Sequence, residues 1–183
     1  NLKKMRGFAM DVLELKAVQD FIRCCTDGWD QGWHERNAGN LTYRLLDHEV
    51  NQIKDQFSKD RAWHDLGVQA SNLAGSCSIT TGSGKYFRNV KPDPEHSIGI
   101  VELNDKGDAW RLLWGLEDGG KPTSEFPSHI LNHSVRLDVT QGKNRVIYHA
   151  HTPSLIAMTF ILPLNSKAFT KALWKSATEC IVV

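Results

Sequence analysis

Two histidines separated by one residue could bind a metal ion. His149 and His151 lie in the segment 146–151, whose β-branched and aromatic residues predict a strand. Alternate residues of a strand point to the same face, so both imidazoles could reach one zinc ion. A catalytic zinc site normally has three protein ligands, and His129 and His133 are candidates for the third, although His133 shares an apolar helical stripe that favours packing. Two surface or hydrogen-bonded histidines are the alternative interpretation.

A glycine-rich loop after another predicted strand could bind a phosphate group. Residues 81–85 combine hydroxyl groups, backbone N–H donors and the cation Lys85, with Ser83 and Gly84 at the centre of the loop. The spacing differs from the Walker pattern and the hydroxyl residue after the lysine is missing, so nucleotide hydrolysis is not indicated. A flexible turn is the alternative.

A polar turn near the N-terminal third of the chain offers amide groups to a ligand. Asn37 and Asn40 flank Gly39, whose backbone could approach a bound molecule closely because it has no side chain. An ordinary turn between a helix and a strand explains the same residues equally well.

Two acids stand where they could exchange protons with a substrate. Glu125 follows Ser124 in the first turn of a predicted helix, where the helix dipole favours a carboxylate even in an inert protein. Glu179 directly precedes an apolar stretch and could equally be a solvated charge at a sheet edge.

The elements that would position these residues alternate between helices and antiparallel strands. Apolar residues at helical steps predict long helices, period-two alternation predicts strands, and a turn at 104–107 predicts a hairpin. Long helices around an antiparallel sheet indicate an α+β or a mixed α/β fold. We expect helices at 12–29, 49–57, 124–140 (with Thr123 or Ser124 as N-cap), 154–162 and 168–177, and strands at 41–45, 77–80, 98–103, 110–114, 146–151 and 180–183.

Composition narrows the class of protein. With 183 residues the chain is predicted to be one domain, 1–183, and its net charge of +1 gives no basic footprint for nucleic acid. Its longest apolar run is too short to span a membrane, and charged residues interrupt any secretory signal. The four cysteines lack a C-x-x-C pair, so we interpret them as reduced thiols of a cytoplasmic protein.

Five separated motifs occur in one order along the chain. They are the segments 37–42, 81–90, 122–127, 146–151 and 178–180. Together they resemble the class II aldolase and adducin family, which contains sugar-phosphate aldolases, a 4-epimerase and non-catalytic adducin heads. The long motif at 81–90 and the sequence Leu113-Trp114-Gly115 favour the branch that acts on L-rhamnulose 1-phosphate.

The resemblance implies a zinc-dependent retro-aldol cleavage that yields dihydroxyacetone phosphate and L-lactaldehyde. It assigns one zinc ion per subunit to His149 and His151, transfer of the C3 proton to Glu125, and action on the aldehyde oxygen across a subunit interface to Glu179. It also implies a mixed α/β fold of three layers, with a mainly antiparallel central sheet flanked by helices. The expected assembly is a cyclic homotetramer with active sites between subunits. The residues that it assigns to the sugar phosphate are Asn37, Gly39, Asn40, Ser83, Gly84 and Ser124.

The family's third zinc histidine lies downstream of the position that matches Glu179. The resemblance therefore predicts a parent chain that is longer by roughly 80 to 90 residues and supplies this ligand. Two alternatives remain open: another sugar-phosphate aldolase or 4-epimerase of the family, and a non-catalytic assembly module.

Overall fold

The computed structural model describes residues 10–176. The chain forms two compact units, Asn1–Ala150 and His151–Val183, and each is described by itself. The first unit contains one sheet with helices on both faces, which confirms the predicted mixed α/β, class II aldolase-like architecture.

The sheet has six strands in the order β2-β5-β4-β3-β1-β6, and every neighbouring pair is antiparallel. The β4–β5 hairpin turns where it was predicted, and the N–H of Gly107 donates to the carbonyl of Asn104 at 3.0 Å. The strands are β1 (Asn40–Arg44), β2 (His64–Asp65), β3 (Cys77–Thr81), β4 (Ile98–Leu103), β5 (Ala109–Gly115) and β6 (Val146–His149).

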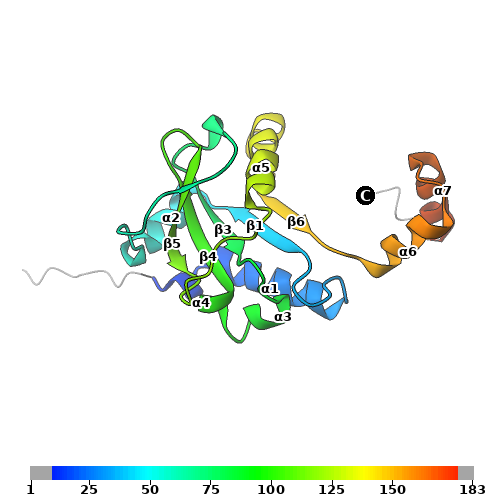
Figure 1. Ribbon diagram of the computed structural model, residues 1–183, viewed down its shortest axis with the longest axis horizontal. Helices are drawn as coiled ribbons and strands as arrows, with labels where there is room; N and C mark the ends of the chain where they lie inside the picture. The colour runs from blue at the N-terminus through cyan, green and yellow to red at the C-terminus, as the bar shows by residue number, and fades with distance from the viewer. Residues whose placement is uncertain (1–9, 177–183) are drawn as a thin grey trace, which may run out of the picture. The chain divides into compact units, whose positions relative to one another are not determined.

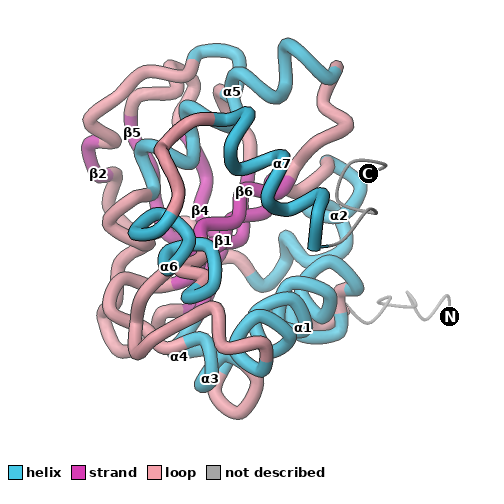
Figure 2. The backbone as a smooth tube through the Cα atoms, turned by 90° about the vertical axis from the view of Figure 1, so that its right-hand side faces the viewer, coloured by secondary structure: helices cyan, strands magenta, loops and turns pink. Residues whose placement is uncertain are grey.

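The face of the sheet that carries Leu41 and Ile79 packs against α1 (Lys16–Asp30). Figures 1 and 2 both place α1 and the short helix α3 (Phe87–Val90) on this side. A 3-10 turn, Val12–Glu14, precedes α1, so the predicted helix 12–29 is divided at Leu15, whose backbone is extended. Asp11 caps the start of that turn, because its carboxylate accepts the N–H of Leu13 at 2.8 Å.

The opposite face packs against α5 (Phe126–Thr140), which buries Phe126 and Ile130 together with Val101 and Leu112 of the hairpin. This helix matches the predicted one at 124–140. The predicted N-cap was wrong, because Glu125 occupies the cap position and Thr123 only accepts the N–H of Glu125 at 3.4 Å.

The segment 47–75 contains the one short helix that was expected and, in addition, the edge strand β2 and two 3-10 turns. The predicted helix at 49–57 is α2 (Asp47–Ile53) followed by a 3-10 turn, Lys54–Gln56. It begins two residues early because the Glu49 carboxylate accepts the N–H of Leu46 at 2.7 Å and so closes its first turn. The segment also contains the 3-10 turn Ser71–Leu73, and α4 (Pro94–Ser97) leads into β4.

Strand β6 is shorter than predicted and ends at His149 instead of His151. Its ladder partner β1 begins at Asn40, which pairs with His149, and Gly39 before it has a φ of +83°. The partner strand therefore turns away where β6 would need further hydrogen bonds. The prediction that His151 belongs to this strand was wrong.

The second unit contains α6 (Pro153–Ile161) and α7 (Ser166–Ser176), which match the helices predicted at 154–162 and 168–177. Within residues 10–176, no helix is both long and apolar enough to cross a bilayer. The strand predicted at 180–183 and Cys180 lie outside the described residues. Cys24, Cys25 and Cys77 are free thiols, as predicted.

Candidate active site

Three predicted site residues from distant parts of the sequence meet at one end of the sheet. Asn40 begins β1, His149 ends β6 directly opposite it, and Glu125 precedes α5. The Oε2 atom of Glu125 lies 2.8 Å from Nδ1 of His149, and the Asn40 amide nitrogen lies 3.5 Å from the same ring nitrogen. The structure therefore brings together a carboxylate, an imidazole and an amide.

The Glu125–His149 contact fixes which nitrogen of the imidazole could bind a metal ion. A carboxylate accepts hydrogen bonds, so Nδ1 donates the proton, and Nε2 of the neutral ring then carries the lone pair. Zinc-binding histidines commonly donate their other N–H to a carboxylate in this way. The side chains of His149 and Glu125 are 38% and 46% exposed, so a ligand can reach them. The arrangement fits the chemistry of a zinc ligand.

Backbone hydrogen bonds join the glycine-rich loop to the segment before Glu125. Thr123 donates its N–H to the carbonyl of Thr81, and Ser83 donates its N–H to the carbonyl of Lys121, both at 2.8 Å. Gly82 and Pro122 form an isolated β-bridge between these two pairs. The loop carrying Ser83 and Gly84 is consequently held next to the one carrying Ser124 and Glu125, and both serines are exposed.

The turn with Asn37 and Gly39 reaches the same end of the sheet through β1. Leu41 donates its N–H to the Thr81 hydroxyl at 3.2 Å, which links this turn to the glycine-rich loop. A side chain at Gly39 would lie 2.6 Å from the carbonyl oxygen of His149, so only glycine allows the backbone to approach β6 this closely. Asn37 itself is exposed, and Asn40 is buried.

Lys85, the cation of the glycine-rich loop, forms an ion pair with Asp118. The pair ties the loop to the turn that follows β5. Lys85 holds the pKa of the Asp118 carboxyl below its ordinary value, chiefly through this hydrogen bond. No local pattern indicates Asp118 as a partner of the loop.

The histidines considered as a third metal ligand are buried beneath the site. His129 Nδ1 and His133 Nε2 each lie 2.8 Å from the hydroxyl of Thr42, which alternates with Asn40 along β1. Burial lowers the pKa of both rings to about 4. The expectation that His133 packs in the interior is confirmed, and Thr42 is a polar anchor of α5 that sequence reasoning missed.

Two predicted site residues do not belong to the described part of the first unit. His151 is exposed and begins the second unit, and Glu179 lies outside the described residues. Within residues 10–176, no three His, Cys, Asp or Glu side chains are grouped so that they could hold a metal ion.

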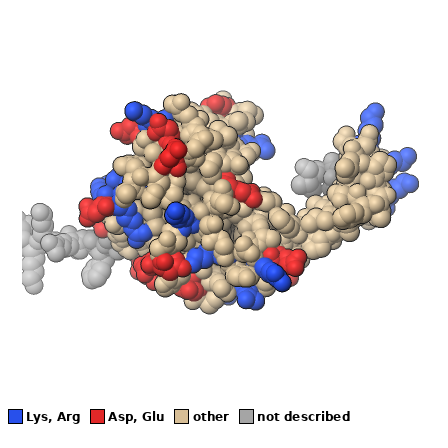
Figure 3. All heavy atoms as spheres, in the orientation of Figure 1, with Lys and Arg blue, Asp and Glu red and all other residues tan. Residues whose placement is uncertain are grey.

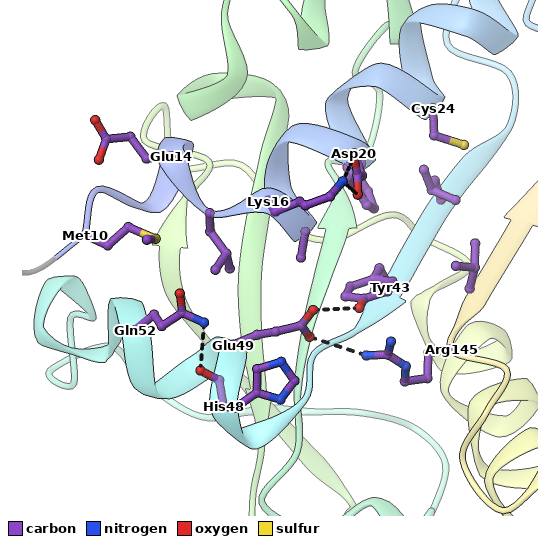
Figure 4. A pocket seen from close by; sticks show the side chains of 15 residues that line it. Met10, Glu14, Lys16, Asp20, Cys24, Tyr43, His48, Glu49, Gln52 and Arg145 are labelled. Carbon is purple, nitrogen blue, oxygen red and sulfur yellow. Dashed lines mark hydrogen bonds and ion pairs between the residues drawn. The ribbon is translucent and has the colours of Figure 1, made fainter.

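A cavity of about 660 Å³ lies on the other face of the sheet, against α1 and α2. Leu41 and Tyr43 of β1 line it, whereas the alternate residues Asn40 and Thr42 face α5. Figure 4 shows Glu49 between Tyr43 and Arg145, with hydrogen bonds to both. This cavity is therefore separate from the candidate site.

Charged side chains of the first unit are distributed without a single sign prevailing. On the face drawn in Figure 3, Lys and Arg are interspersed with Asp and Glu. This pattern agrees with the net charge of +1.

Comparisons with known proteins identify the family. Residues 19–181 match the Class II Aldolase and Adducin N-terminal domain. The chain is 43% identical to a rhamnulose-1-phosphate aldolase of Mannheimia succiniciproducens and 45% identical to one of Escherichia coli K12, in each case over 91% of this chain and 61% of the relative. A crystal structure of a sugar-phosphate aldolase from Thermotoga maritima shares the fold, with a TM-score of 0.58, 23% identity, and coverage of 73% of this chain and 52% of that one. The chain, which spans about three fifths of the length of its curated relatives, belongs to the class II aldolase and adducin family.

Proposed function

We propose that the intact protein is a zinc-dependent lyase that cleaves L-rhamnulose 1-phosphate reversibly to dihydroxyacetone phosphate and L-lactaldehyde. The observation that carries the proposal is the exposed Glu125–His149 pair, held beside two polar loops. The names of the relatives support the same substrate.

His149 and His151 would hold the zinc ion, together with a third ligand from outside the described residues. The proton on Nδ1 of His149 supports this role because it leaves Nε2 as the donor atom. Bound zinc would act as a Lewis acid that polarises the ketose carbonyl and stabilises the negative charge that develops as the carbon–carbon bond breaks.

The chain's own groups supply binding and proton transfer. Cleavage of the C3–C4 bond removes a proton from the C4 hydroxyl, releases L-lactaldehyde and leaves C3 to be protonated. We assign the C3 proton to Glu125 and the proton of the aldehyde oxygen to Glu179 of a neighbouring subunit. We assign the phosphate and the adjacent oxygens to the polar groups of Asn37, Gly39, Asn40, Ser83, Gly84 and Ser124.

The assembly and compartment belong to the same proposal. A homotetramer with active sites at subunit interfaces would allow Glu179 to reach a neighbour's site. Three free thiols among the described cysteines support a reducing compartment such as the cytoplasm.

Metal removal tests this function. We expect chelation of the intact protein to abolish the release of dihydroxyacetone phosphate from L-rhamnulose 1-phosphate, and added zinc to restore it. A panel with L-fuculose 1-phosphate and L-ribulose 5-phosphate would measure substrate preference. Full activity after zinc has been removed would contradict the proposed metal, and faster conversion of another sugar would reassign the substrate. Less than a tenth of an equivalent of zinc, without activity, would favour an assembly module.

A further inference from the structure

A buried histidine lies between the 37–40 segment and strand β6. The imidazole of His34 is 4% exposed and stacks on Phe87 with 3.7 Å between ring centroids and 11° between planes. Its Nδ1 atom lies 2.9 Å from the carbonyl oxygen of Ala38, and its Nε2 atom lies 2.6 Å from the hydroxyl of Tyr148. One ring therefore contacts Ala38, which precedes Gly39 in the sequence, and Tyr148, which precedes His149.

The direction of these two hydrogen bonds follows from their partners. A carbonyl oxygen only accepts, so Nδ1 of His34 carries the proton and donates it to Ala38. Nε2 of the neutral ring is then an acceptor, and the Tyr148 hydroxyl donates to it. A continuous chain of hydrogen bonds thus runs from Tyr148 on β6 through His34 to Ala38.

Two glycines leave the space that the His34 and Tyr148 side chains occupy. A side chain at Gly39 would lie 2.5 Å from Nδ1 of His34, and one at Gly28 of α1 would collide with the Tyr148 hydroxyl. With Phe87 stacked on one face, the ring has little freedom to shift.

The 37–40 segment needs such an external support. Its first three residues precede β1, and the positive φ angles of Arg36 (+54°) and Gly39 (+83°) mark tight changes of chain direction on either side of Ala38. The Ala38 carbonyl is the point at which His34 can fix the segment relative to β6.

We propose that His34 and Tyr148 are a positioning pair that holds the substrate-binding segment 37–40 in register with His149. The expected effect on KM rests on the proposed function, because that function assigns Asn37, Gly39 and Asn40 to the sugar phosphate. Neither side chain of the pair has to touch the substrate. Its role is to preorganise the segment before the substrate arrives.

The test is Tyr148→Phe in the intact, zinc-loaded protein, since this change removes only the hydroxyl. We expect KM for L-rhamnulose 1-phosphate to rise about 3- to 10-fold, with kcat changed less than about 2-fold and the zinc content unchanged. The matched control is Tyr43→Phe, which removes a hydroxyl on the same face of the sheet that donates to Glu49 and contacts neither His34 nor the segment. The control should leave KM unchanged.

Substitutions of His34 separate the two hydrogen bonds. His34→Asn places an amide N–H near the Ala38 carbonyl, so it should retain a lower KM than His34→Leu, which removes both bonds. If His34→Leu does not fold, the comparison of Tyr148→Phe with Tyr43→Phe still tests the positioning role.

Hydrogen exchange provides a measurement that does not depend on the reaction. Tyr148→Phe should accelerate amide exchange at residues 37–40 and leave the β4–β5 hairpin unchanged. Faster local exchange in a protein that does not cleave the sugar phosphate would support the positioning pair and contradict the proposed function. Unchanged KM together with unchanged amide exchange would overturn the proposed positioning role. A decrease of kcat without a change in KM would also overturn it, because a destabilised fold alone lowers the fraction of active protein.

Discussion

Two glutamates on opposite faces of the same sheet have different surroundings. Glu49, in the cavity against α1, accepts hydrogen bonds from the Tyr43 hydroxyl, the Leu46 amide and Arg145, and its side chain is 14% exposed. Glu125, at the end of the α5 face, contacts His149 and is 46% exposed. The first carboxylate is surrounded by hydrogen-bond donors of the protein, whereas the second is open to solvent and to ligands.

The comparison teaches how to separate a structural acid from a reactive one in this fold. A carboxylate with several protein donors is stabilised in its charged form and has little capacity left for a substrate. A carboxylate that shares one imidazole can still receive or release a proton. The cavity beside Glu49 does not alter this distinction, because Glu49 already bonds to Tyr43 and Arg145 there (Figure 4).

The largest expected effect is that of Glu125→Gln on catalysis. We expect kcat for sugar-phosphate cleavage to fall about 100- to 1000-fold, because the amide cannot transfer the proton. Unfolding by urea should change by less than about 0.5 kcal/mol, since the side chain is exposed. Activity within 2-fold of the wild type would remove Glu125 from its assigned role.

The next effect is a pH dependence of the free energy of unfolding, caused by the buried histidines His129 and His133 beneath Glu125. Burial lowers the pKa of His129 and His133 to about 4, while the unfolded chain takes up these protons near pH 6.5. The stability that neutral rings provide is therefore complete above pH 6.5 and is lost as the pH falls from 6.5 toward 4. We expect the free energy of unfolding to decrease by about 2 kcal/mol per ring between pH 7 and pH 5.

Urea titrations at several pH values measure this slope. The double variant His129→Gln, His133→Gln should show a flatter profile over the same interval. Equal slopes for the two proteins would contradict the assignment of the proton uptake to these rings.

A smaller effect is expected for Glu49→Gln on stability. Loss of the charged acceptor should reduce the free energy of unfolding by about 1.5 kcal/mol, because Tyr43 and Arg145 lose their charged partner. The matched control is Asp20→Asn on the rim of the same cavity, whose side chain is 59% exposed in an ion pair with Lys16. The control should change unfolding by less than about 0.5 kcal/mol. Similar losses for both variants would show that burial does not distinguish them.

Local patterns were sufficient for most of the fold. The apolar repeat through Phe126, Ile130, His133 and Leu137 predicts α5, which buries the first three of them together with His129. The end of β6 could not be predicted in this way, because it depends on Gly39, which directly precedes a strand far away in the sequence. Periodicity describes one element, whereas the length of a strand also depends on its partner.

The candidate site was predicted only in part, and its supports were not. The motifs indicated Asn40, Glu125 and His149, which the structure brings together. His34 and Tyr148 are separated by 114 positions, and neither stands out by its local pattern. Groups that act through tertiary contacts leave no spacing that a single sequence could reveal.

The close approach of Gly28 to the Tyr148 hydroxyl also constrains how this lineage can change. Any side chain at position 28 would collide with that hydroxyl, so it is tolerated only if position 148 first loses the oxygen. The order of the two substitutions then decides whether an intermediate sequence folds. Helix α1 and strand β6 are therefore expected to co-vary at these two positions among descendants of this protein.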